Sequence, residues 1–261
     1  MSRTLKLTLA YDGTEFNGWQ IQPALPTVQG TLAEAVGRIT GEKVLPQGSG
    51  RTDAGVHALG QVASFALESP IPARGLLIAL NDTLPPAVRV ISVEEVPANF
   101  HARHCAKAKT YRYRIYRGDI CPPFVARYAF HDPYPMNEEA IISATDSIVG
   151  KHDFTSFAAS DPDRSARIAA GEAANDDGGA PSNVRTVHSA LWARSSDELV
   201  FTVRGDGFLH HMVRNLVGTL LQVGKGSLRA GDMARILEAR ERSAAGPTAV
   251  ACGLYLVSVE Y

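Results

Sequence analysis

The order of strand-like and helix-like segments in the first hundred residues limits the possible folds most strongly. Residues 5–11 alternate leucine with polar side chains, which is the period of a strand that buries one face. Thr27 is a typical N-cap residue, and the apolar side chains after it recur at helical spacing up to Ile39. The next segments predict strands at 44–45, 61–67 and 88–96, and a helix at 73–80 that stops before Pro85. This β-α-β-β-α-β order is ferredoxin-like.

The rest of the chain repeats this alternation with insertions. It predicts strands at 110–116, 187–193, 199–204 and 254–260, and helices at 138–149, 208–223 and 232–240. We therefore expect an α/β (α+β) protein of two ferredoxin-like halves, residues 1–105 and 106–261. The halves are expected to join in a continuous mixed, largely antiparallel sheet around a pseudo-dyad with a central cleft. Residues 165–182 hold almost no large apolar side chain and predict a mobile insertion in the second half.

Composition narrows the class of protein and its compartment. Apolar residues make up 45% and charged residues 20%, as in ordinary globular proteins, and no apolar run approaches the roughly 20 residues of a membrane span. The start of the chain alternates like a strand, unlike a signal peptide. The three cysteines, Cys105, Cys121 and Cys252, form no C-x-x-C pair. These features predict a cytoplasmic protein.

The charge balance requires any nucleic-acid surface to be local. The chain has 26 basic and 27 acidic residues, less basic than is usual for a small nucleic-acid-binding domain. However, residues 96–118 and 207–231 contain basic side chains and no acidic ones. A neutral total therefore still allows a positive face.

A glycine-rich loop at residues 48–57 is the most unusual segment. Its glycines allow backbone conformations that hold polar side chains at the edge of a sheet. Arg51 and Asp53 lie two residues apart and point to the same side if the loop is extended. A carboxylate beside a guanidinium stays ionised, which suits a nucleophile or a base. The simpler alternative is a turn with a surface ion pair.

Aromatic and basic side chains alternate at residues 109–114. Tyr111 and Tyr113 are expected on one face of a strand, and Arg112 and Arg114 on the other. Aromatic rings stack on nucleic-acid bases and basic side chains contact phosphates. The alternative is an amphipathic strand whose tyrosine face belongs to the core.

The predicted helix at 208–223 carries three polar residues of interest. His210 and Arg214 are one turn apart and should be neighbours, and Arg214 needs a partner in an otherwise apolar helix. His210 and His211 would point about 100° apart on a helix and so are poorly placed to share a metal. We therefore expect no structural metal.

Residues 50–57 resemble the active-site loop of the tRNA pseudouridine synthase A family, which converts uridines at positions 38 to 40 of the tRNA anticodon stem-loop to pseudouridine. The resemblance spans nearly the whole chain. Its other signatures, in order, are residues 11–13, 18–20, 100–103, 111–113, 152–157, 185–187, 210–215 and 253–256. Two departures are the long insertion at 165–182 and Val250, where many relatives carry proline.

The resemblance implies a role for each of several residues. Asp53 is implied to be the catalytic aspartate, Tyr111 to stack on the target uracil, and Arg214 to pair with Asp53. Leu254 is implied to pack near the base, and Arg51 to help displace or replace the flipped nucleotide. Further RNA contacts are expected from Lys109, Arg112, His210 and His211. The family is a cofactor-free isomerase that works as a homodimer with tRNA lying across both subunits.

Two other classes of function stay open at this point. One is an RNA-binding protein of this fold that has lost catalysis, against which the presence of Asp53, Tyr111 and Arg214 argues. The other is an aspartate-dependent hydrolase that releases free base from nucleosides, which leaves the basic strand unexplained.

Overall fold

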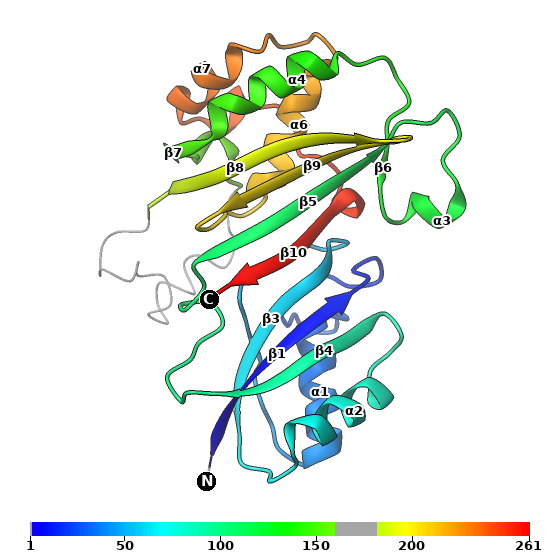
Figure 1. Cartoon of the computed structure of the whole chain (residues 1–261), viewed down its shortest axis with the longest axis vertical. Helices are drawn as coiled ribbons and strands as arrows, with labels where there is room; N and C mark the ends of the chain where they lie inside the picture. The colour runs from blue at the N-terminus through cyan, green and yellow to red at the C-terminus, as the bar shows by residue number, and fades with distance from the viewer. Residues whose placement is uncertain (1, 160–181) are drawn as a thin grey trace. The chain divides into compact units, whose positions relative to one another are not determined.

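The computed structural model describes residues 2–159 and 182–261 (Figure 1). The insertion expected at 165–182 lies, apart from Ser182, outside the described residues. Two compact units divide the chain, and each is described by itself. Unit 1 comprises Met1–Arg112, Pro122–Phe130 and Ala251–Tyr261, and unit 2 comprises Tyr113–Cys121 and His131–Val250. The expected boundary at 105/106 stays a prediction.

Among the described residues, ten strands form one mixed sheet, as expected from the sequence. Their order is β4-β1-β3-β10-β5-β9-β8-β7, with β2 paired to β3 and β6 (Phe130–His131) paired to β5 (Ala108–Tyr116). The expected continuous mixed sheet is therefore confirmed. The pseudo-dyad and the central cleft concern the arrangement of the halves and stay predictions.

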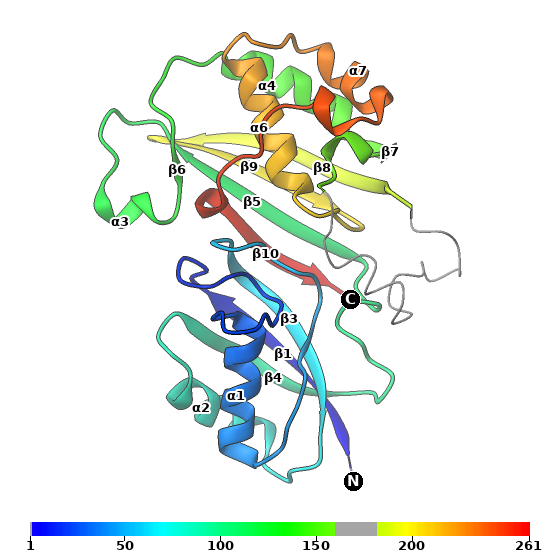
Figure 2. The same cartoon turned by 180° about the vertical axis from the view of Figure 1, so that it is seen from behind.

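Unit 1 has the ferredoxin-like order predicted from the sequence. Its elements are β1 (Arg3–Tyr11), α1 (Val28–Thr40), β2 (Gln47–Gly48), β3 (His57–Leu67), α2 (Ala73–Thr83) and β4 (Val88–Val96), followed by the short α3 (Pro123–Ala126) and by β10 (Leu254–Glu260). β1 pairs antiparallel with both β3 and β4, and β2 pairs antiparallel with β3. β10 instead runs parallel to β3 and pairs at His57 and Ala58. Both α1 and α2 lie on one side of β1, β3 and β4 (Figure 2).

The core of unit 1 follows from the alternation in β1. Leu5, Leu7 and Leu9 are fully buried, as are Leu32 of α1 and Leu80 of α2. These side chains form the apolar layer between the sheet and the two helices, because every second residue of a strand faces the same side.

The N-terminus of α1 is confirmed, whereas one expected strand of unit 1 is wrong. The Thr27 hydroxyl accepts a hydrogen bond from the Gly30 N–H, as an N-cap does. The strand expected at 44–45 is absent among the described residues, and pairing begins instead at Gln47. Pro46 has no N–H to donate to a strand partner, and the Leu45 side chain is exposed.

Unit 2 packs helices against an antiparallel sheet. Its strands are the C-terminal part of β5, β7 (Gly150–Asp153), β8 (Val184–Ser195) and β9 (Glu198–Gly205), and its helices are α4 (Glu138–Thr145), α6 (Met212–Gly224) and α7 (Asp232–Ala239). β8 pairs antiparallel with β7 and with β9. The three helices gather on one side of these strands (Figures 1 and 2). No helix of the described chain is long and apolar enough to span a membrane.

Two helices of unit 2 are shorter than expected. The helix expected at 208–223 begins only at Met212, because His211 adopts a left-handed backbone conformation with φ of 59°. The helix expected at 138–149 ends at Thr145, and a 3-10 turn at Asp146–Ile148 follows it.

Candidate active site

The loop between β2 and β3 carries Arg51 and Asp53, both half-buried. The backbone N–H of Trp19 donates to the Thr52 carbonyl at 3.0 Å, and the N–H of Val56 donates to the Asp53 carbonyl at 3.1 Å. Gly18 has a φ of 83°, and a Cβ at this position would lie 2.4 Å from the Thr52 carbonyl oxygen. The segment after β1 therefore lies directly against the loop backbone and fixes the main chain on both sides of Asp53.

Tyr111, on β5, lies close enough to Asp53 for the two side chains to interact electrostatically. The ring is 8% exposed. Burial raises the pKa of the Tyr111 hydroxyl well above its ordinary value, and the nearby Tyr11 and Asp53 raise the pKa further. The phenol therefore stays protonated and neutral, so its ring offers a flat apolar surface beside the carboxylate.

Leu254 also belongs to unit 1 and lies near the end of the loop. It is 5% exposed and begins β10, where the next residue, Tyr255, pairs with His57. A Cβ at Gly55 would lie 3.3 Å from the Cβ of Ala251, so the start of β10 packs against the loop. The structure thus brings Asp53, Tyr111 and Leu254 into the same part of unit 1.

The basic face of β5 is only partly available for phosphates. The alternation is confirmed, because Tyr111 and Tyr113 are buried while Arg112 and Arg114 are half-buried. Arg114 makes a bidentate ion pair with Glu198 at 2.8 and 2.5 Å. The alternative of a core tyrosine holds for Tyr113, which is fully buried.

Lys109, one of the expected RNA contacts, lies against the loop. Its ammonium donates to the Ser49 carbonyl at 2.6 Å, and a Cβ at Gly50 would lie 3.2 Å from the same nitrogen. Lys109 therefore supports the loop backbone directly.

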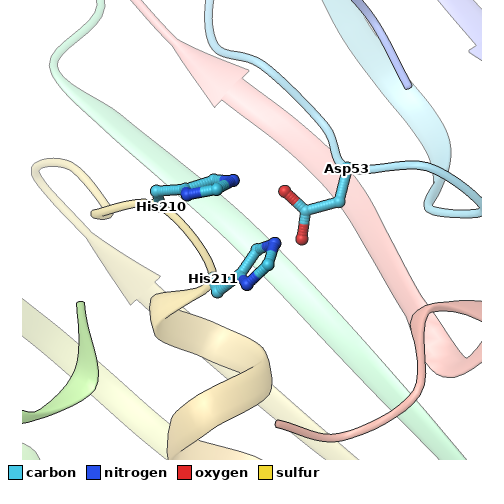
Figure 3. Close-up of side chains that lie close together, drawn as sticks. All are labelled: Asp53, His210 and His211. Atoms are coloured by element: carbon cyan, nitrogen blue, oxygen red, sulfur yellow. The ribbon is translucent and has the colours of Figure 1, made fainter. Parts of the chain in front are cut away.

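Arg214, His210 and His211 belong to unit 2. Arg214 lies in the first turn of α6 and is half-buried, and its Nε donates to the Ala249 carbonyl at 2.7 Å. Figure 3 shows the two histidines, from the segment that precedes α6, and Asp53, from the β2–β3 loop of unit 1. Since the units are described separately, the expected pairing of Arg214 with Asp53 stays a prediction.

The expected geometry of the two histidines is wrong. His210 and His211 precede α6, so they do not point about 100° apart as adjacent helical residues would, and His210 is not one helical turn from Arg214. Their rings instead lie against each other, with centroids 4.0 Å apart and planes at 37°. Within either unit alone, the described residues contain no group of three His, Cys, Asp or Glu side chains close enough to share a metal ion.

The sequence alone assigns no role to His57, the last residue of the loop motif, yet this side chain connects several segments of unit 1. It is 2% exposed. Its Nδ1 accepts from the Gly13 N–H at 3.0 Å, its Nε2 lies 3.2 Å from the Arg127 carbonyl, and its ring stacks on Tyr255. Burial lowers the pKa of His57, although Asp12 opposes this effect. The neutral ring with its proton on Nε2 satisfies both contacts.

Asp12 lies beside His57, with 3.2 Å between its Oδ1 and the histidine Nδ1. Partial burial raises the pKa of Asp12, but hydrogen bonds from Thr14 and Tyr128 and the nearby His57 outweigh burial and lower the pKa overall. Asp12 is thus ionised at neutral pH and held in place by its hydrogen-bond donors. It lies directly after the end of β1, whereas Asp53 is the carboxylate of the loop.

Comparison with known proteins agrees with the resemblance noted in the sequence. The family described as tRNA pseudouridine synthase matches residues 8–104 and 144–261. A tRNA pseudouridine synthase A of Solibacter usitatus is 49% identical over 99% of this chain and 100% of the relative. The protein of that name from Moorella thermoacetica is 44% identical over 98% of this chain and 99% of the relative. The one from Latilactobacillus sakei subsp. sakei is 42% identical over 100% of both.

A solved Cbf5–Nop10–Gar1 complex is similar over 83% of this chain and 45% of the solved chain, with 13% identity and a TM-score of 0.36. The family match and the relatives extend over most of the sequence. The chain belongs to the tRNA pseudouridine synthase family of isomerases.

Proposed function

We propose that this chain isomerises uridine to pseudouridine at positions 38, 39 and 40 of the tRNA anticodon stem-loop. The family and the full-length relatives named tRNA pseudouridine synthase A support this assignment. The observation that carries it is the neighbourhood of Asp53 and Tyr111 in unit 1. A carboxylate beside a buried neutral aromatic ring is suited to react with a base that stacks on that ring.

The reaction rearranges bonds within one nucleotide. The bond between N1 of uracil and C1′ of ribose breaks, the base turns, and C5 bonds to C1′ while the C5 proton leaves to water and N1 takes up a proton. The base must first leave the helical stack, which costs a few kcal/mol. Asp53 acts in this scheme as a nucleophile toward C1′ or C6, or as the base that removes a sugar proton.

The other site residues act by holding the flipped nucleotide. Tyr111 stacks on the uracil, Leu254 packs beside it, and Arg51 takes part in displacing or replacing it. Arg214 pairs with Asp53 through a guanidinium–carboxylate contact. Its guanidinium is already oriented by the Ala249 carbonyl.

Binding of tRNA depends on local positive charge in this proposal. Lys109, Arg112, His210 and His211 contact the RNA, with Lys109 also supporting the loop. Because phosphate contacts release counterions, tRNA affinity should fall steeply as salt rises. A flat salt response would contradict the proposed basic surface.

The reaction needs no cofactor and no metal in this proposal, since bond breaking and bond making occur within the same nucleotide. The protein acts as a homodimer in the cytoplasm, with tRNA lying across both subunits. Sedimentation of the purified protein with and without tRNA tests the dimer.

Tritium release separates the proposed activity from the two alternatives. Unmodified tRNA labelled with tritium at uracil C5 is mixed with the protein, without added metal or cofactor. Release of tritium to water supports the isomerase, and Asp53→Asn should abolish release while tRNA binding persists. Free uracil in the products would support a hydrolase instead. Tight tRNA binding by the wild type without release would support a silent RNA-binding protein.

A further inference from the structure

Gln61 is a fully buried amide in the middle of β3, and the reaction scheme above does not use it. It is 0% exposed in a strand that otherwise buries mostly apolar side chains. A buried amide is costly unless its donors and acceptors are all used. Its hydrogen bonds therefore indicate what it is for.

Every described hydrogen-bond partner of the Gln61 side chain belongs to the loop that carries Asp53, to β3 itself or to β1. Its Nε2 donates to the Gly50 carbonyl at 2.9 Å. Its Oε1 accepts from the Ser49 hydroxyl at 2.7 Å and from the Val62 N–H at 3.1 Å. Ser49 is itself fully buried, so the Gln61 amide holds the first half of the loop in place.

Tyr11 extends these contacts to the residue next to Asp53. Its hydroxyl lies 2.8 Å from the Thr52 hydroxyl and also forms a side-chain hydrogen bond with Gln61. Burial raises the pKa of Tyr11 to about 12, and the hydrogen bonds from Thr52 and Gln61 reduce that effect. The phenol is therefore a neutral hydrogen-bonding group at neutral pH.

The loop needs such support because its glycines supply no side-chain packing of their own. Glycine loses more conformational freedom on ordering than any other residue. A displacement of about 1 Å at a reacting group costs roughly 100-fold in rate. The contacts described above restrict Ser49, Gly50 and Thr52, which are three of the four residues that directly precede Asp53.

We propose that Gln61 is a positioning residue, which through Ser49, Gly50 and Tyr11 holds the loop so that the Asp53 carboxylate meets the target nucleotide. The proposal rests on the proposed function, in which Asp53 reacts with that nucleotide. Gln61 itself does not touch the substrate.

A second buried glutamine of unit 1 provides a matched control. Gln29 is 2% exposed, and its amide accepts from the Ile21 N–H and donates to the Pro46 carbonyl, both at 2.9 Å. Gln61→Met and Gln29→Met each remove an amide of the same length from a buried site. Only the first removes contacts to Ser49 and Gly50.

The test measures the single-turnover rate of tritium release at saturating tRNA, the tRNA dissociation constant and the melting temperature of each variant. Gln61→Met should lower the rate about 10- to 100-fold with the dissociation constant within about twofold. Gln29→Met should lose similar stability and keep its rate within about twofold. Equal rates for the two variants at a temperature where both are folded would overturn the proposal.

Gln61→Glu gives a readout that a purely structural role does not move. A protonated carboxyl keeps one donor and one acceptor, and burial raises the pKa of a glutamate at this position. Its rate relative to wild type should therefore rise as the pH is lowered from 8 to 6, whereas the Gln61→Met ratio stays flat. If the ratio of the Gln61→Glu rate to the wild-type rate does not change with pH, the proposal is overturned, even if Gln61→Met does not fold.

Wild type and Asp53→Asn are run in parallel, so that the two proposals fail differently. An inactive wild type, or an active Asp53→Asn, refutes the proposed function and the positioning proposal with it. An active wild type and inactive Asp53→Asn, with a fully active Gln61→Met, refutes the positioning proposal alone.

Discussion

Replacing Gly13 by alanine should separate the segment after β1 from the loop that carries Asp53. A Cβ at this position would lie 2.0 Å from the Val56 carbonyl oxygen, about 1.4 Å short of the 3.4 Å of ordinary contact. The backbone of residue 13 fixes the position of the Cβ, and its partner is a backbone oxygen, so no side-chain rotation relieves the overlap. A shift of this size also breaks the 3.0 Å hydrogen bond from the Gly13 N–H to His57.

The expected cost has two parts. Overpacking costs about 1–3 kcal/mol, and a buried hydrogen-bonding group left without its partner costs about 1–3 kcal/mol more. The sum of about 2–6 kcal/mol corresponds to a fall in melting temperature of roughly 4–24 °C for a chain of this size.

Thermal unfolding followed by circular dichroism measures this change, and tritium release at a temperature where the variant is folded measures its effect on the loop. Gly231→Ala is the control, because no atom lies within 4 Å of a Cβ there and the backbone φ of −66° suits alanine. A Gly13→Ala protein that melts within about 2 °C of wild type would refute the reasoning, because the overlap would then relax without loss.

Three further predictions concern other parts of the molecule. Tyr111→Leu should reduce the rate of tritium release more than Tyr111→Phe, because only the phenylalanine keeps a stacking ring; equal losses would assign the effect to the hydroxyl. Lys225→Met should lower the free energy of unfolding, measured in urea, by about 2 kcal/mol. The substitution removes the cation that lies 2.7 Å from Asp132, whose side chain is only 1% exposed. An unchanged midpoint of urea unfolding would contradict this. The lowered pKa of His57 means that the unfolded chain takes up this proton more readily, so the free energy of unfolding should fall as pH drops below about 6.5. This fall should be weaker in His57→Gln when melting is compared between pH 7 and 5, and identical pH dependences would show that His57 does not contribute.

Several elements followed from local composition in the sequence. The strands expected at 88–96 and 254–260 have the bounds predicted, because both segments are rich in β-branched and aromatic side chains, which favour strands. The start of α6 was misplaced because Leu209 continues the apolar spacing of the helix. The turn at His211 depends instead on tertiary contact, since the His210 carbonyl accepts from the N–H of Ala159.

The candidate site divides in the same way. Arg51 and Asp53 were recognisable because glycines surround them in the sequence. Gln61 and His57 were not, since Gln61 reads as one more residue of a strand and His57 as the last residue of the loop motif. A signal was nevertheless present, because a glutamine inside an apolar strand needs partners, and those partners lie on a loop whose path the sequence does not specify.

The parallel pairing of β10 with β3 links the loop that carries Asp53 to the order in which the chain is synthesised. Tyr255 pairs with His57 across roughly 200 residues of intervening sequence, which makes this contact among the last to form. On the ribosome, residues 254–260 are synthesised after the whole of unit 2, so the edge of β3 next to the Asp53 loop lacks its β10 partner until then. An exposed strand edge is prone to pair with other chains. We therefore expect a chain that ends shortly before residue 254 to leave this edge of β3 without its β10 partner and to be prone to aggregate.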